Sequence, residues 1–547
     1  MTGRRSWTGC VGVALFACSL CAEAQTKAGG TLAPSCSGRF PPVSCVAAGR
    51  TSNSDSSASA SRDAASAPPQ APAALTAQPP AGSAPATIGA AAGAVAATAA
   101  TTDTAQAEPP PSKKPDAAAE EEPLPLGKDE LFGADKTDAA TGKKPPAVSF
   151  RGFLMNITAY TYADPAHWST AVTYAQLGAS GQFSESTKWK VTVRGDVDPV
   201  YFWSDFYNDA VKKDQRTGFL FEETYIDTSL GNWDFRIGRQ NIIWGEVVGL
   251  FVADVVSAQN QLQFILPPFD IIRIPQWAAR AEYFFGDSHA ELIWIPYPTY
   301  NDIGKPGADF YPVQPGSTPA GFTQSFLGEV IPDRNLANTN YGLRLNTLKG
   351  GWDASAFYYS SMDAAPTFYR NQADPTTLQY QPVHNRIWQV GGTVGKAFGS
   401  VVGHAEAVYT SGRQYEVTTL NQPNGVVPQN TLEYIFSFDF TLPKDWLLNL
   451  QFFQNIFFNH DPNLLFDAYE SGASVLLRGK LGKWEPEILW IQSLNRSENM
   501  IRPRLTWRPA PNWRAALGVD IFNGGSTTYF GRFDDRDRVY AEIRFDF

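Results

Sequence analysis

Histidine and cysteine, which commonly serve as catalytic bases, nucleophiles and metal ligands, are sparse in the aromatic-rich part of this 547-residue chain. Five histidines are present, and no two of them have the spacing of metal ligands: His167, His289, His384, His404 and His460. All five cysteines lie at or before Cys45, so the later residues offer neither a thiol nucleophile nor a Cys-based zinc site. We therefore expect no enzymatic activity, no metal and no cofactor. A hydrolytic site assembled from residues far apart in the sequence would leave no such spacing.

Charged residues alternate with apolar ones in several runs, and this pattern could serve either a ligand or the fold. Six arginines are candidates for drawing anionic groups into an interior: Arg194, Arg236, Arg502, Arg504, Arg508 and Arg514. Acids that could offset them share the inward faces: Asp196, Asp234, Glu485, Glu487 and Glu542. The alternative is a ladder of mixed charges that stiffens the wall, because buried charges are retained when they are paired.

The elements that would position these residues are strands. From Val148 onward eighteen strand-like runs alternate with turns, and no apolar run is long enough to cross a bilayer as a helix. Connections after even-numbered runs are short, as at Gly231-Asn232, whereas those after odd-numbered runs are mostly long. The runs are 148–163, 168–184, 187–203, 218–230, 233–245, 276–286, 288–298, 339–349, 352–364, 384–398, 400–415, 430–442, 445–459, 468–481, 483–495, 498–509, 512–523 and 536–547. This arrangement is typical of an outer-membrane β-barrel, whose short turns face the periplasm.

Tryptophan placement separates a membrane barrel from a soluble β-sandwich, which would show the same alternation of apolar and polar residues. Six tryptophans follow short polar turns and open strand-like runs: Trp189, Trp233, Trp352, Trp446, Trp484 and Trp513. An indole at a membrane interface keeps its ring in apolar surroundings and its N–H wet. The last run places Phe545 and Phe547 on one face and resembles the terminal signal by which the barrel assembly machinery recognises its clients. We expect an all-β, transmembrane antiparallel barrel of about 18 strands over 148–547.

The connection 246–275 is unusually apolar for a surface loop. We expect it to fold back into the barrel and narrow the pore. The candidate constriction residues are Glu246, Phe251, Asp254, Phe264, Phe269, Asp270 and Arg273. The charged members of this set either pair with strand charges or face a ligand, since buried charges need partners.

The first 147 residues have a different composition. Arg4-Arg5, an apolar stretch and Ala22-Glu23-Ala24 predict a signal peptide over 1–24 and a mature chain that begins at Gln25. A rival interpretation takes Leu15-Phe16-Ala17-Cys18 as a lipoprotein cleavage box. Residues 25–147, rich in Ala, Pro, Ser and Thr, predict a disordered periplasmic tether. Cys36 and Cys45 could close a disulfide there.

A family resemblance adds to this interpretation. Gly238-Arg-Gln-Asn-Ile-Ile-Trp-Gly-Glu246, Asp254-Val-Val, Phe264-Ile-Leu-Pro-Pro-Phe-Asp270 and Arg273-Ile-Pro-Gln-Trp277 resemble the signature of a proteobacterial outer-membrane family, domain of unknown function 1302. The chain departs from it at 257–260, where the resemblance leads us to expect Asn-Pro and an acidic residue. Members are associated with exporters of the resistance-nodulation-division type and with hydrophobic cargo. The resemblance therefore implies transport.

A net charge of −10 and a pI near 5.2 speak against nucleic acid as a partner. We expect a channel or transporter-like barrel in the outer membrane of a Gram-negative cell, passing a small hydrophobic or amphipathic molecule. The alternative is a non-conducting structural or surface-interaction barrel with a periplasmic tether. Expected partners are outer-membrane lipid, the barrel assembly machinery, a small-molecule cargo and a periplasmic or inner-membrane export partner.

Overall fold

The structure is a computed structural model that describes residues 148–247, 249–314 and 318–547. The expected signal peptide over 1–24, the tether over 25–147, and Cys36 and Cys45 lie outside these residues. Within them no helix has the length and apolar character needed to cross a membrane.

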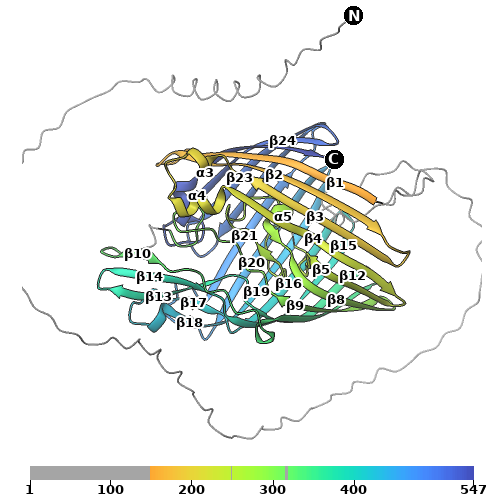
Figure 1. Cartoon of the computed structure of the whole chain (residues 1–547), viewed down its shortest axis with the longest axis horizontal. Helices are drawn as coiled ribbons and strands as arrows, with labels where there is room; N and C mark the ends of the chain where they lie inside the picture. Colours follow the sequence, from red (N-terminus) through yellow and green to blue (C-terminus); the bar gives the residue numbers. More distant parts are fainter. Residues whose placement is uncertain (1–147, 248, 315–317) are drawn as a thin grey trace, which may run out of the picture. The chain divides into compact units, whose positions relative to one another are not determined.

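Eighteen antiparallel strands form one closed barrel, which confirms the predicted fold class and strand number (Figure 1). Each strand pairs with the next barrel strand along the chain, and the last pairs with the first through Phe153–Thr161 and Arg538–Asp546. Closure leaves no sheet edge with unpaired backbone groups. The barrel strands are β1 (Val148–Thr161), β2 (His167–Gln182), β3 (Thr187–Val197), β4 (Thr217–Leu230), β5 (Trp233–Gln240), β8 (Gln276–Phe285), β9 (Ser288–Tyr297), β11 (Asn340–Lys349), β12 (Trp352–Met362), β15 (Arg386–Phe398), β16 (Val401–Ser411), β19 (Asn430–Leu442), β20 (Trp446–Phe458), β21 (Tyr469–Arg478), β22 (Trp484–Ser493), β23 (Asn499–Ala510), β24 (Trp513–Asn523) and β25 (Arg538–Asp546).

Alternation along each strand separates an apolar outer face from a polar inner face. On β24, Trp513 and Leu517 are 46% and 66% exposed, whereas Asp520 is 0% exposed. The same alternation leaves apolar side chains exposed around the outside, which is the surface that a bilayer would cover. At the chain end Phe547 stacks on Phe545, and its backbone exchanges two hydrogen bonds with Gly152.

Short turns lie at one rim, with the chain terminus, and long connections lie at the other (Figure 1). The long connections carry further elements beyond the barrel wall. These are α3 (Val200–Trp203), α4 (Asp209–Gln215), β6 (Ala258–Gln259), α5 (Phe269–Ile272), β7 (Arg273–Ile274), β10 (Thr323–Phe326), η2 (Leu336–Asn338), β13 (Thr367–Asp374), β14 (Thr377–Val383), β17 (Gln414–Glu416), η3 (Pro423–Gly425), β18 (Val426–Pro428) and η4 (Gly531–Arg536). β13, β14 and β10 form a small sheet of their own beyond the long-loop rim.

Several predicted runs extend past the ends of their strands, and two of them, 187–203 and 233–245, extend the furthest. The run 187–203 stops as a strand at Val197, because Pro199 lacks the N–H that a ladder needs and is the N-cap of helix α3. The run 233–245 stops at Gln240, which pairs with Gln276, the first residue of β8. The pairing of β5 with its neighbouring strands ends at Gln240, and the chain turns into the barrel there.

Candidate functional site

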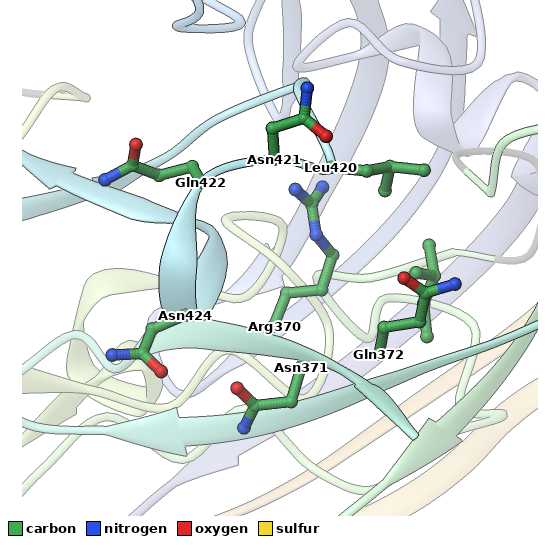
Figure 2. A pocket seen from close by; sticks show the side chains of 8 residues that line it. Arg370, Asn371, Gln372, Leu420, Asn421, Gln422 and Asn424 are labelled. Atoms are coloured by element: carbon green, nitrogen blue, oxygen red, sulfur yellow. The ribbon is translucent and has the colours of Figure 1, made fainter. Parts of the chain in front are cut away.

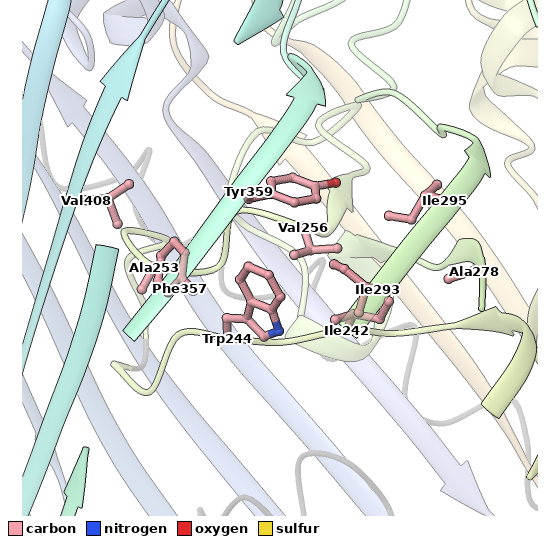
Figure 3. Close-up of a cluster of buried hydrophobic side chains, with 10 residues drawn as sticks. All are labelled: Ile242, Trp244, Ala253, Val256, Ala278, Ile293, Ile295, Phe357, Tyr359 and Val408. Atoms are coloured by element: carbon pink, nitrogen blue, oxygen red, sulfur yellow. The ribbon is translucent and has the colours of Figure 1, made fainter. Parts of the chain in front are cut away.

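The connection between β5 and β8, residues 241–275, lies against inward-facing side chains of the barrel wall; we call it the inward segment. Its first part forms an apolar cluster with β9 and β12 (Figure 3). Trp244 packs its ring against those of Phe357 and Tyr359, at centroid distances of 5.0 and 5.7 Å. Its indole nitrogen donates to the Glu291 carboxylate at 3.3 Å. Apolar side chains of this part, which would be unsuited to a water-exposed surface, are thus buried against the wall.

Glu406 on β16 holds the next part of the inward segment. Its carboxylate accepts hydrogen bonds from the backbone N–H groups of Glu246, Val247 and Ala253, the last two at 2.7 and 2.9 Å. Glu406 is 3% exposed, so these bonds are shielded from water. Bonds to an ionised acceptor are stronger than those between neutral groups. One strand carboxylate therefore anchors a turn of the inward segment.

Glu246 points into the wall instead of into open space. Its carboxylate lies 3.8 Å from an Arg344 guanidinium nitrogen on β11 and 3.6 Å from Nδ1 of His404 on β16. The Glu246 side chain is 3% exposed. This geometry agrees with the paired alternative for the charged residues of the segment.

Asp254 and Arg273 join the two halves of the inward segment. Arg273 Nε donates to Asp254 Oδ2 at 2.9 Å. The Arg273 guanidinium also lies over the rings of Phe251 and Phe269, 5.3 and 5.1 Å from their centroids. Four of the predicted constriction residues therefore form one packed unit, in which the rings flank the cation.

Helix α5 reaches the opposite part of the wall. Asp270 pairs with Arg544 on β25, and its backbone carbonyl accepts from Arg194 on β3 at 3.0 Å. Ile271, which is fully buried, packs with Phe153 and Met155 of β1. In Figure 1 the α5 label lies within the outline of the barrel. The inward segment thus contacts β16 at one end of its path and β25 and β1 at the other, which indicates that it crosses the interior.

Phe264 sits in a second aromatic cluster near the long-loop rim. Its ring lies 5.0 Å from Phe533 and 6.2 Å from Phe522, between centroids. Its backbone has a φ of 55°, a left-handed conformation that a phenylalanine adopts only when packing compensates for the strain. Close by, Arg502 donates to the carbonyl of Leu266 at 3.0 Å.

All six predicted interior arginines have acidic partners. The pairs are Arg194 with Glu222 at 2.7 Å, Arg236 with Asp227 at 2.6 Å, Arg502 with Asp520 at 2.7 Å, Arg504 with Glu542 at 3.1 Å, Arg508 with Glu485 at 2.8 Å and Arg514 with Glu542 at 3.1 Å. Each of the six pairs links two different strands of the wall, from β3–β4 to β24–β25. This pairing favours the mixed-charge ladder over a row of arginines free to attract anions.

Two pockets lie on the long-loop side. The larger, about 620 Å³, is bounded by the inward segment, by β12, β15, β19, β20, β21 and β22, and by long connections. The smaller, about 360 Å³, is lined by β13, by β14 and by Leu420, Asn421, Gln422 and Asn424, and none of its lining residues belongs to a barrel strand (Figure 2). In it Arg370 donates to the backbone carbonyl of Val417 at 2.9 Å and to that of Thr419. The larger pocket is therefore the one that borders the barrel interior.

Asp309 holds a long connection, residues 298–339, against the rim. Its carboxylate lies 2.9 Å from Nε2 of His167 and accepts from Ser169 Oγ at 2.9 Å and Tyr207 Oη at 2.8 Å. Burial alone would raise the pKa of Asp309, but the hydrogen bond and charge of His167, with Arg536 and Tyr207, lower it below its ordinary value. Ser169 bonds to the acid instead of the imidazole, so this group lacks the order of a hydrolytic triad.

Sequence reasoning missed several residues that hold the inward segment. Glu406, Arg344 and Arg544 carry no local signal, because each acts on residues more than 90 positions away. Alternation alone could have placed them on inward faces. Among the described residues, no three His, Cys, Asp or Glu side chains gather as a metal site would require.

The chain resembles several solved structures at low sequence identity. Solved structures with a similar fold include OccAB3 of Acinetobacter baumannii, with 8% identity, 73% of this chain and 99% of that chain covered, and a TM-score of 0.44. OmpT of Vibrio cholerae, folded in vitro, matches with 10% identity, coverage of 73% and 97%, and a TM-score of 0.38. None of the curated proteins compared with the sequence matches it. The family model described as "Protein of unknown function (DUF1302)" matches residues 158–442, which confirms the resemblance, and the chain belongs to that family.

Proposed function

We propose that this protein is an outer-membrane channel or transporter-like barrel that passes a small hydrophobic or amphipathic molecule, with the inward segment as its constriction. One observation carries the proposal. The inward segment is tied to β16 at Glu406 and to β25 at Arg544, and an apolar-walled pocket lies beside it. A segment bound to different parts of the wall narrows the interior.

The polarity of the interior supports an amphipathic cargo over a fully polar one. Interior charges pair with one another, as Arg502 does with Asp520, and so leave few groups to replace the hydration shell of a small ion. The pocket beside the inward segment instead offers rings such as Phe251, Phe453 and Phe457. Apolar cargo gains about 25 cal/mol for each Å² of its surface removed from water there.

Replacing residues 249–270 with a short Gly/Ser connection tests the proposal in planar bilayers and proteoliposomes. We expect higher single-channel conductance, faster uptake of polar solutes and weaker selection for apolar ones, because the crossing segment is gone. The matched control replaces residues 371–379 of the β13–β14 hairpin, which lies outside the barrel wall, and should leave conductance unchanged.

Two outcomes would contradict the proposal. A correctly folded variant with unaltered conductance and uptake would show that the inward segment is not the constriction. A native barrel that folds but passes neither ions nor apolar solutes would favour the alternative of a structural or surface-interaction barrel.

A further inference from the structure

The 620 Å³ pocket beside the inward segment, which we call the vestibule, has two kinds of wall. One is apolar and aromatic, with contributions from the inward segment, from β20 and β22 and from the connections after β16 and β20. Its members include Leu250, Phe251, Ile265, Phe453, Phe457 and Ile491. A pocket of this size and lining accommodates a drug-sized apolar body.

The other wall is acidic. Five carboxylates line the vestibule against three guanidinium groups, an excess of two negative charges: Asp254, Asp363, Glu433, Glu470 and Glu498 against Arg413, Arg496 and Arg532. Two further charged residues flank this wall: Arg273, which pairs with Asp254, and Asp467, which pairs with Arg496. Their opposite charges leave the excess of two negative charges unchanged. The three guanidinium groups are already engaged. Arg413 binds Asp363 at 2.6 Å, Arg496 binds Glu470 at 2.6 Å, and Arg532 donates to the carbonyl of Pro312 at 3.0 Å.

Two buried oxygen atoms of this wall have no hydrogen-bond donor among the described residues. They are Oδ1 of Asp254, whose side chain is 3% exposed, and Oδ1 of Asn455. The amide of Asn455 is oriented by its nitrogen, which donates to Glu433 at 3.3 Å, so its oxygen must face elsewhere. The hydroxyl of Ser257, beside Asp254, donates to the carbonyl of Ile242 at 3.0 Å. Buried acceptors without donors are costly, so both atoms favour a ligand that brings hydrogen-bond donors.

We propose that the vestibule binds amphipathic amines, that is, an apolar body carrying a protonated primary or secondary amine. This inference deepens the proposed function and rests on it. An ammonium group supplies donors and no acceptor, which suits unpartnered oxygen atoms and an excess of carboxylates. The rings of the apolar wall add favourable contacts with a cation. A carboxylate on the same apolar body would be repelled by Glu433 and the neighbouring acids. It would also lack a free guanidinium group to bind, because each arginine of the vestibule already has a partner.

Three probes that share one ring system test the proposal: 1-naphthylmethylamine, 1-naphthylmethanol and 1-naphthylacetate. Binding to the folded full chain in detergent is measured by equilibrium dialysis, and uptake is measured in proteoliposomes. We expect the amine to bind at least about tenfold more tightly than the acetate, the effect of one charge-assisted hydrogen bond. Asn455→Leu and Glu433→Gln should each reduce that preference, and Glu433→Gln leaves Arg413 paired with Asp363.

The control is Glu485→Gln, an acid that pairs with Arg508 and does not line the vestibule; it should retain the preference. A heat-dependent gel shift verifies that each variant is folded. Equal binding of the three probes, or a preference that survives both vestibule variants, would overturn the inference even if the barrel conducts. Amine-selective binding by a barrel that fails to conduct would support the site and overturn the proposed function.

Discussion

Glu406→Ala should release the turn of the inward segment that its carboxylate now holds. The backbone N–H groups of Glu246, Val247 and Ala253 would lose their acceptor in a buried place. A hydrogen bond to a charged group contributes about 1.5–3 kcal/mol, so three lost bonds set an upper range of about 4.5–9 kcal/mol. Water that enters the space left by the side chain recovers part of this.

We therefore expect local opening to become easier by about 3 kcal/mol, which corresponds to a roughly 100-fold larger open population. Hydrogen exchange of peptides covering residues 246–253, followed by mass spectrometry of the folded barrel in detergent, measures this change directly. Glu406→Gln retains one acceptor oxygen and should give an intermediate effect. Single-channel recordings of the same variants should show additional openings of larger conductance.

Glu485→Ala is the matched control, because Glu485 pairs with Arg508 at 2.8 Å, on the wall and away from the inward segment. It should leave exchange over 246–253 unchanged. If a folded Glu406→Ala barrel shows the protection of the native protein at these residues, the reasoning that this carboxylate anchors the segment is refuted.

Three further expectations follow from other parts of the barrel. The folded protein should remain rich in β-structure in detergent and migrate differently on a gel before and after boiling, because closure pairs every strand; identical migration with helical circular dichroism would contradict this. Glu542→Gln removes the charge that Arg504 and Arg514 share and should destabilise the barrel by about 3 kcal/mol in a denaturant titration, whereas an unchanged midpoint would mean that the pairs contribute little. Because the pKa of Asp309 is lower in the folded protein than its unfolded value of 3.8, this carboxylate contributes stability above pH 3.8 that is lost as the pH falls through the folded pKa. Acid below about pH 4 should therefore increase hydrogen exchange in the connection 298–339, and Asp309→Asn should abolish that pH dependence.

The wall of the barrel could be predicted from the sequence because its determinants are local. A strand has a period of two, so Trp513 and Leu517 take one face and Asp520 takes the other wherever the strand lies. Turn residues such as Gly231 mark where strands end, and the alternation of short and long connections sets the two rims. The apolar composition of 246–275 likewise favoured an inward position, since burial of such side chains is independent of which partners they find.

The partners within the barrel were decided only by the tertiary structure. Closure brings β16 and β25 to the inward segment, so Glu406 meets Val247 from 159 positions away and Arg544 meets Asp270 from 274 positions away. Alternation states that a charge faces inward, but which acid reaches which arginine depends on register and on the path of the long connections. For the same reason the sequence named Asp254 as a candidate but could not show that Arg273, 19 positions away, binds one of its carboxylate oxygens.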